Sequence, residues 1–292
     1  MFLQLLASGL VTGAIYGLVS MGFILIYKAS RVFNLAQGEM VMLGGLLAWA
    51  GVNQLHLPPW ATILFIIVAA VVLGLVVERF TMRPLIGKPI LTLIMMCIAI
   101  SLFLRGIASL LWPIEHAFPS GFLPRGMMAL GSVRISYPLL FGFIASVLVL
   151  IILTLFFKYT RTGLAMRVQA DDQQVAQSLG LNVKRLMAYT WSIAALVAVV
   201  GGFFLAPVAG VGPGLAMAGL KALPVVLLAG LESIPGAFVA GLIVGVGEFM
   251  AVGYLNDITK GGMGDLFPFA LMLVILMIRP YGLFGEQRIE RV

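Results

Sequence analysis

Few side chains in this sequence could do chemistry, and the most informative of them interrupt long apolar stretches. Asn34, Gln37 and Glu39 lie together in one six-residue run, and Glu248 lies in an apolar stretch near the other end of the chain. Polar and ionisable groups are costly inside a bilayer, and those that occur there usually face a bundle interior or a water-filled path. We therefore take Asn34, Gln37, Glu39 and Glu248 as candidate residues of a translocation path.

The run 34–39 has two interpretations. A helix broken near Gly38 could line a cavity with its polar groups, because irregular backbone survives at membrane depth only where it is buried or wet. Alternatively, a helix could end near the membrane surface, where its polar groups would be solvated. Glu248 could reach the surface or pair with a cation of a neighbouring span or subunit. We expect Arg105 to extend to the surface from the outer end of its span, and Glu232 to be solvated.

Motifs of known catalytic chemistry are absent from this sequence. The Gly87-Lys88 pair is followed by Pro89 and lacks the earlier glycine of a P-loop, so the chain itself cannot be a P-loop ATPase. No H-E-x-x-H, no G-x-S-x-G and no paired carboxylates occur. The two histidines and the single Cys97 offer no metal cluster. We expect a non-catalytic chain that binds no cofactor.

The elements that must position these groups are membrane-spanning helices. The chain has 292 residues, of which 62% are hydrophobic and 10% charged, against about 25% charged in a soluble domain. Because a span needs roughly 20 apolar residues, we expect an all-α polytopic membrane protein with about eight or nine transmembrane helices, some of them broken or re-entrant, in a single domain over 1–292. The expected spans are 3–27, 32–52, 60–77, 90–112, 137–157, 186–206, 220–231, 237–252 and 266–278.

The segments 220–231 and 237–252 leave one choice open. They either cross as a pair or form a re-entrant hairpin around Pro235. Ala237, Gly241 and Gly245 have the small-residue spacing that lets helix backbones approach closely in a membrane, which favours a compact bundle.

Charge predicts the orientation. The loops 28–31, 79–88, 158–185 and 279–292 hold thirteen of the eighteen Lys and Arg residues. Because basic loops stay in the cytoplasm, we expect the N-terminus outside and the C-terminus in the cytoplasm. This asymmetry explains the net charge of +7 without a nucleic-acid partner.

The long polar loop 158–185 predicts one short cytoplasmic helix over 172–179. Asp171 is a suitable N-cap and Gly180 a suitable stop, while Val175, Ala176 and Leu179 fall on one face. A helix that binds the membrane surface would carry Lys and Arg on its polar face. This segment carries Asp and Gln there, which favours a protein partner.

Five motifs in order resemble those of the LivH-type permeases of branched-chain amino acid ABC importers, over nearly the whole chain. The run N-L-A-Q-G-E at 34–39 is similar to the N-[FL]-A-[HQ]-G-E signature of that family, and the terminal R-P-Y-G-L-F-G at 279–285 also fits. The other three motifs are G-L-V-T-G-A-I-Y-G-L at 9–18, the loop from T-G-L-A-M-R at 162–167 to A-Q-S-L-G-L at 176–181, and S-I-P-G-A at 233–237.

The resemblance implies one of two non-identical permease subunits, together forming the translocation path of an importer in the bacterial inner membrane. Two cytosolic ATPase subunits would hold ATP and Mg, and a periplasmic binding protein would deliver substrate. The short cytoplasmic helix would be the coupling helix that docks on an ATPase. The coupling residues that this implies are Asp171, Asp172, Val175, Ala176, Leu179 and Gly180.

The transported ligand stays open at this point, since such families also serve urea, short amides and aromatic acids. The chain has Glu232 where the family has glycine before S-I-P-G, which puts a cytoplasmic contact in question. An ion-coupled secondary transporter would show internal repeats and several coupling carboxylates, and a channel would show a selectivity ring. Neither pattern is evident in the sequence.

Overall fold

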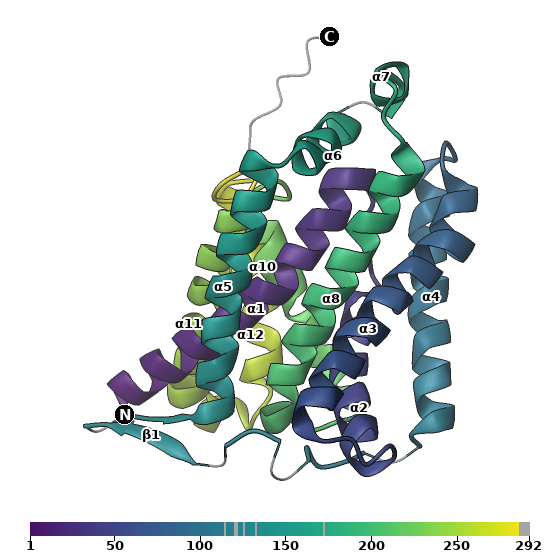
Figure 1. The fold of residues 1–292 in the computed structure, drawn as a ribbon. Helices are drawn as coiled ribbons and strands as arrows, with labels where there is room; N and C mark the ends of the chain where they lie inside the picture. The colour runs from purple at the N-terminus through teal and green to yellow at the C-terminus, as the bar shows by residue number, and fades with distance from the viewer. Residues whose placement is uncertain (114, 120–121, 125, 132, 172, 286–292) are drawn as a thin grey trace.

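The computed structural model describes residues 1–113, 115–119, 122–124, 126–131, 133–171 and 173–285, so the predicted coupling residue Asp172 lies outside the described residues. Figure 1 shows a bundle of long helices, which confirms the expected all-α architecture. The helices are α1 (Phe2–Ser30), α2 (Gln37–Asn53), α3 (Pro59–Val77) with its short extensions Glu78–Met82 and Arg83–Leu85, α4 (Ile90–Leu111), α5 (Tyr137–Tyr159), α6 (Arg161–Asp171), α7 (Gln173–Ser178), α8 (Val183–Ala209), α9 (Pro213–Leu220), α10 (Ala222–Ala229), α11 (Ile234–Thr259) and α12 (Met263–Ile278).

Six helices in the described part of the chain are long and apolar enough to cross a membrane. They are α1, α3, α4, α5, α8 and α11. Three shorter segments lie among them: the apolar pair α9 with α10, the apolar α12, and the 17-residue α2. The six long helices are fewer than the eight or nine spans expected from the sequence, and the total reaches nine only when the three shorter segments are counted.

A small hairpin lies at the end of the bundle where the chain begins (Figure 1). Strands β1 (Met127–Leu130) and β2 (Val133–Ser136) pair antiparallel, with Met127 opposite Ser136. The Gln4 side chain forms two 2.7 Å hydrogen bonds with the backbone of Arg134. The hairpin therefore ties the start of α1 to the loop before α5, a contact that the sequence did not predict.

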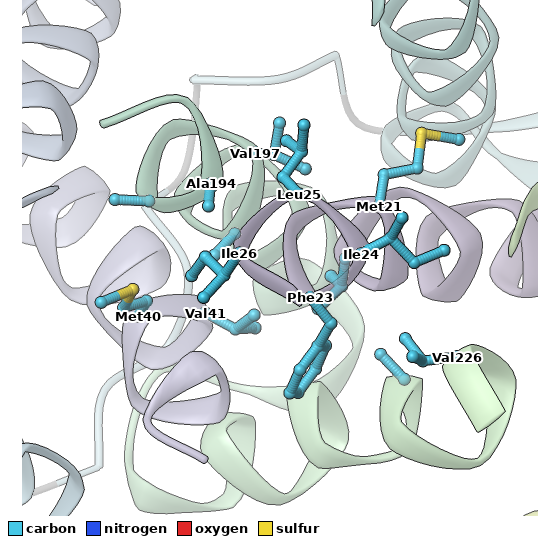
Figure 2. Close-up of a cluster of buried hydrophobic side chains, with 14 of the residues drawn as sticks. Met21, Phe23, Ile24, Leu25, Ile26, Met40, Val41, Ala194, Val197 and Val226 are labelled. Carbon is cyan, nitrogen blue, oxygen red and sulfur yellow. The ribbon is translucent and has the colours of Figure 1, made fainter. Parts of the chain in front are cut away.

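Helix α1 runs through the middle of the bundle and is enclosed by other helices along most of its length (Figure 1). Figure 2 shows Phe23, Ile24 and Ile26 among side chains of three other helices: Met40 and Val41 of α2, Ala194 and Val197 of α8, and Val226 of α10. This central helix is apolar on every side, as expected for a fully buried span.

Helices α1 and α11 pack along each other through glycine. A Cβ on Gly241 would meet the carbonyl oxygen of Gly13 at 2.5 Å and the backbone nitrogen of Gly17 at 2.6 Å. Such backbone contact is possible only without side chains, which is why small residues recur at helix interfaces in membranes. The compact packing predicted around Gly241 and Gly245 is confirmed, and its partner is α1.

The connection between α1 and α2 turns back into the bundle. Arg31 ends α1 in the left-handed conformation, with φ 56°, and the chain becomes helical again only at Gln37. The Gln37 amide packs against Gly22, which lies eight residues before the end of α1, or about 12 Å at the helical rise of about 1.5 Å per residue. Helix α2 therefore begins inside the bundle.

The segment after α8 is also broken. Helices α9 and α10 meet at Lys221 and lead from the end where Val211 pairs with His116 to the opposite end, where Leu283 and Phe284 hydrogen-bond to Leu228 and Ala229. Helix α11 then begins at Ile234, one residue before Pro235, and continues for 26 residues. The segments 220–231 and 237–252 thus cross as a pair, and α9 extends the first of them back to Pro213.

Candidate functional site

The polar run 34–39 fills the break before α2. The Asn34 amide donates to Gln37 Oε1 at 3.0 Å, and its carbonyl oxygen accepts the backbone N–H of Ala36 at 3.1 Å. The Gln37 amide donates to the Ala194 carbonyl of α8 at 3.4 Å. Asn34 and Gln37 are fully buried. The interpretation as a solvated helix end is therefore wrong, because protein satisfies the polar groups of a broken helix.

Glu39 forms an ion pair with α4. Arg105 Nη2 donates to Glu39 Oε1 at 2.7 Å, and the Glu39 side chain is 1% exposed while that of Arg105 is 43% exposed. Arg105 is partly exposed, in line with the expected extension to the surface, but its guanidinium also binds a buried charge, which the sequence did not predict. Within the described residues, Glu39 Oε2 and Arg105 Nε have no hydrogen-bond partner.

The Arg105 pair lies beside a deep apolar cleft. The cleft has a volume of about 750 Å³ and runs between α2, α3 and α4, with Leu43, Leu73 and Leu104 among its lining residues. Helix α4 stands apart from the centre of the bundle in Figure 1. The ion pair between Arg105 and Glu39 is thus a polar contact that joins α4 to the rest of the molecule.

Glu248 forms a second ion pair, with a cation at the break between α9 and α10. Lys221 Nζ lies 2.8 Å from Glu248 Oε1 and 3.0 Å from Asp265 Oδ1 of α12. Glu248 is 5% exposed, whereas the Asp265 side chain is 88% exposed. Of the two alternatives for Glu248, pairing with a neighbouring span is the one found. Lys221 therefore bridges a buried carboxylate and an exposed one.

The polar loop 158–185 contains two helices where one was expected. Helix α6 ends at Asp171 and α7 follows over Gln173–Ser178, so Asp171 closes one helix and does not directly precede the next. Residues 161–171 are helical because they pack on the bundle: Met166 is 1% exposed, and the Gln169 amide donates to the Ala29 carbonyl at 3.0 Å.

The apolar face predicted for Val175, Ala176 and Leu179 is partly buried and partly exposed. Ala176 is fully buried, whereas Val175 is 50% exposed and Leu179 is 66% exposed. Gly180 ends the segment with φ 76°, and its N–H donates to Gln177 while that of Leu181 donates to Ala176, the pattern of a Schellman cap. The predicted stop at Gly180 is confirmed. The segment is anchored through Ala176 and displays Val175 and Leu179.

Comparison with known proteins decides the family. The family described as "Branched-chain amino acid transport system / permease component" matches residues 5–276 of the chain. This protein is a member of that permease family. BraD of Pseudomonas aeruginosa, a high-affinity branched-chain amino acid transport system permease protein, is 33% identical over 305 residues, covering 100% of this chain and 98% of its own.

Other relatives agree with this assignment. The LivH permease proteins of Escherichia coli K12 and Salmonella typhimurium, both of high-affinity branched-chain amino acid transport systems, are 32% identical over 307 residues, with 100% and 98% coverage. A chain of PsaBC from Streptococcus pneumoniae, solved in complex with a Fab, is similar in fold, with a TM-score of 0.50, 14% identity and coverage of 95% and 93%. The resemblance inferred from five motifs is confirmed, and the relatives are named as transport proteins.

In this member of the permease family, Glu232 makes a contact that the sequence did not suggest. Its carboxylate pairs with the Arg31 guanidinium, which also donates through Nε to the Ala170 carbonyl at 3.0 Å. Partial burial lowers the pKa of Arg31, but the hydrogen bond and charge of Glu232 together raise it above its ordinary value. The expected solvation of Glu232 is incomplete, since Arg31 joins the end of α1 to α6 and to the turn before α11.

Sequence reasoning missed the cationic partners Arg105 and Lys221 of this permease. Arg105 was assigned to the membrane surface, and Lys221 lies beside apolar sequence with no motif around it. The one sequence signal for such residues is the rarity of cations in apolar stretches, which indicates a functional or structural role but does not predict the partner.

Proposed function

We propose that this permease is the transmembrane subunit of an ABC importer for branched-chain amino acids and forms half of the translocation path. A second homologous permease subunit would form the other half, and a periplasmic binding protein would deliver the substrate. Two cytosolic ATPase subunits would hold ATP and Mg. The chain would lie in the bacterial inner membrane. The match to the permease family over residues 5–276 supports this proposal.

The observation that carries the coupling role is the exposure of Val175 on α7 and of Leu179, the residue that directly follows α7. Two large apolar side chains are thus exposed on a short segment whose Ala176 is buried. At the end of the bundle away from the chain start, α6 and α7 project beyond the long helices (Figure 1). An ATPase subunit that covered these side chains would remove their apolar surface from water, which is the main driving force of protein association.

Movement of α7 would reach the central helix through α6. Gln169 and Ala170 of α6 hydrogen-bond to Ala29 and Arg31 at the end of α1. The broken segment 31–36 follows immediately and carries α2. A displacement of α6 would therefore act on the helix that contacts most of the bundle and on the nearby break, as an alternating-access mechanism requires.

Among the path candidates, Glu39 and Glu248 are better suited to contact a zwitterionic substrate than Asn34 and Gln37. Glu39 pairs with Arg105, which is partly exposed, and Glu248 pairs with Lys221, which also contacts the largely exposed Asp265. Asn34 and Gln37 are buried and would hold the break in place.

The orientation follows from charge. The bundle end that holds Arg31, α6 and α7 carries the basic loops, so we place it and the C-terminus in the cytoplasm. The hairpin β1–β2 would then face the periplasm. A cysteine introduced at Gly131 should react with an impermeant thiol reagent from outside intact spheroplasts, whereas one introduced at Gly180 should not.

The coupling proposal is tested by Leu179→Asp, with Gln177→Asp as a matched control on an exposed neighbouring position of α7. Affinity-tagged chain should co-purify with an ATPase subunit. Leu179→Asp should reduce ATPase recovery and transport by about tenfold, the effect of losing about 1.4 kcal/mol at an interface, while Gln177→Asp keeps both. Transport without any ATPase partner, or full transport by Leu179→Asp, would contradict the proposal.

A further inference from the structure

A basic pocket lies where α1, α5, α6 and α11 meet, away from the proposed path. It has a volume of about 300 Å³, and Lys28, Lys158 and Arg167 are among the residues that line it. The other lining residues are Thr154, Phe157, Glu232, Ser233, Ile234, Pro235 and Phe284. Three cations from three different helices thus face one small volume at the end of the membrane-spanning region.

Three cations and one carboxylate line the pocket. Glu232 is paired with Arg31, which lies on the same bundle end. Within the described part of the chain, neither Lys158 nor Arg167 forms an ion pair, and both residues are exposed. Lys28 stands over the Phe157 ring at 5.5 Å from its centroid, which orients its stem along the pocket wall.

The pocket adjoins a lipid-facing apolar surface. Near Thr154, helix α5 exposes Leu148, Ile151, Ile152 and Leu155. Helix α11 runs beside α5, as the contact between Phe143 and Phe238 shows, and exposes Val239 and Ile243. A ligand with a phosphate in the pocket would therefore have exposed apolar side chains of α5 and α11 available to its acyl chains, which a soluble anion would leave unused.

We propose that this basic pocket binds the headgroup of an anionic phospholipid, with Lys158 and Arg167 contacting its phosphate and the acyl chains lying along α5 and α11. Ammonium and guanidinium groups both bind phosphate oxygens strongly. Basic pockets between helices on the cytoplasmic side of a membrane suit such headgroups. Because Arg167 belongs to α6, the bound lipid would stabilise the position of α6, which connects α1 to the α7 segment proposed above to receive the ATPase.

The test is lipid retention by the full chain in detergent micelles that contain equal amounts of phosphatidylglycerol and phosphatidylcholine, measured by native mass spectrometry. Wild type should retain phosphatidylglycerol preferentially. The variant Lys158→Gln/Arg167→Gln should lose about fivefold of this preference for each cation removed. The matched control Lys184→Gln/Arg185→Gln removes two charges from the same loop, outside the pocket, and should retain the wild-type preference.

Three results would overturn the proposal. Equal retention of the two lipids by wild type would show that the pocket does not select an anionic lipid. An equal loss of preference in the Lys184→Gln/Arg185→Gln control would show that the preference comes from general surface charge. Displacement of phosphatidylglycerol by millimolar inorganic phosphate would assign the pocket to a soluble anion. Melting temperatures of both variants within about 2 °C of wild type show that the chains compared are folded. Co-purification of the ATPase is measured separately, so failure of this site leaves the coupling proposal standing.

Discussion

Substitution of Gly241 by alanine tests the packing that sets the position of α1. The new Cβ would lie 2.5 Å from the Gly13 carbonyl oxygen and 2.7 Å from Gly17 Cα, where ordinary contact begins at 3.4 Å. The atoms in conflict belong to the backbone of a buried helix and cannot turn away. To relieve the overlap, α1 and α11 must separate locally by about 0.9 Å.

The magnitude follows from two opposing terms. Overpacking of a close-packed core costs about 1–3 kcal/mol, and a separation of this size loses a quarter to a half of the dispersion energy of each contact that opens. Alanine recovers about 1 kcal/mol of helix propensity relative to glycine. We expect Gly241→Ala to lower the free energy of unfolding by about 1–2 kcal/mol.

The control is Gly106→Ala in α4, where a Cβ would meet no atom within 4 Å. This variant gains the helix propensity without the overlap and should be as stable as wild type or more stable. Both variants are measured by reversible unfolding of the purified chain in mixed micelles with increasing dodecyl sulfate. Equal stability of Gly241→Ala and Gly106→Ala would refute the claim that direct backbone contact holds α1 against α11.

Two further predictions concern the buried ion pairs. Arg105→Met should lower the free energy of unfolding by about 2 kcal/mol, which is less than the roughly 3–5 kcal/mol of a fully buried pair because Arg105 is partly exposed. In the same unfolding assay, the double variant Glu39→Met/Arg105→Met should regain most of this stability. A double variant as unstable as Arg105→Met would contradict this prediction. Lys221→Met should destabilise the chain because it leaves Glu248 unpaired. The double variant Lys221→Met/Glu248→Gln should recover the melting temperature but not substrate uptake, measured in proteoliposomes with the partner subunits. Full uptake by the double variant would exclude this pair from the path.

Much of the membrane architecture could be predicted from the sequence because its signals are local. The length of an apolar run sets the number of possible spans, and Gly180 marks a helix end through its own backbone freedom. The spacing of Ala237, Gly241 and Gly245 indicates a close helix contact. These properties depend on neighbouring residues, so they can be read along the chain. The same holds for the five ordered motifs that indicated the family.

The sequence alone established a multi-spanning helical membrane protein of a known permease type, with polar groups at Asn34, Gln37, Glu39 and Glu248. Only the tertiary structure decided what these groups contact. Arg105 and Glu39 are separated by 66 positions, and Arg31 and Glu232 by 201. Apolar run length and helical period do not specify which helix faces meet, because that choice depends on the packing of the whole bundle. The fit of close-packed backbones around α1 therefore determines which charges become partners.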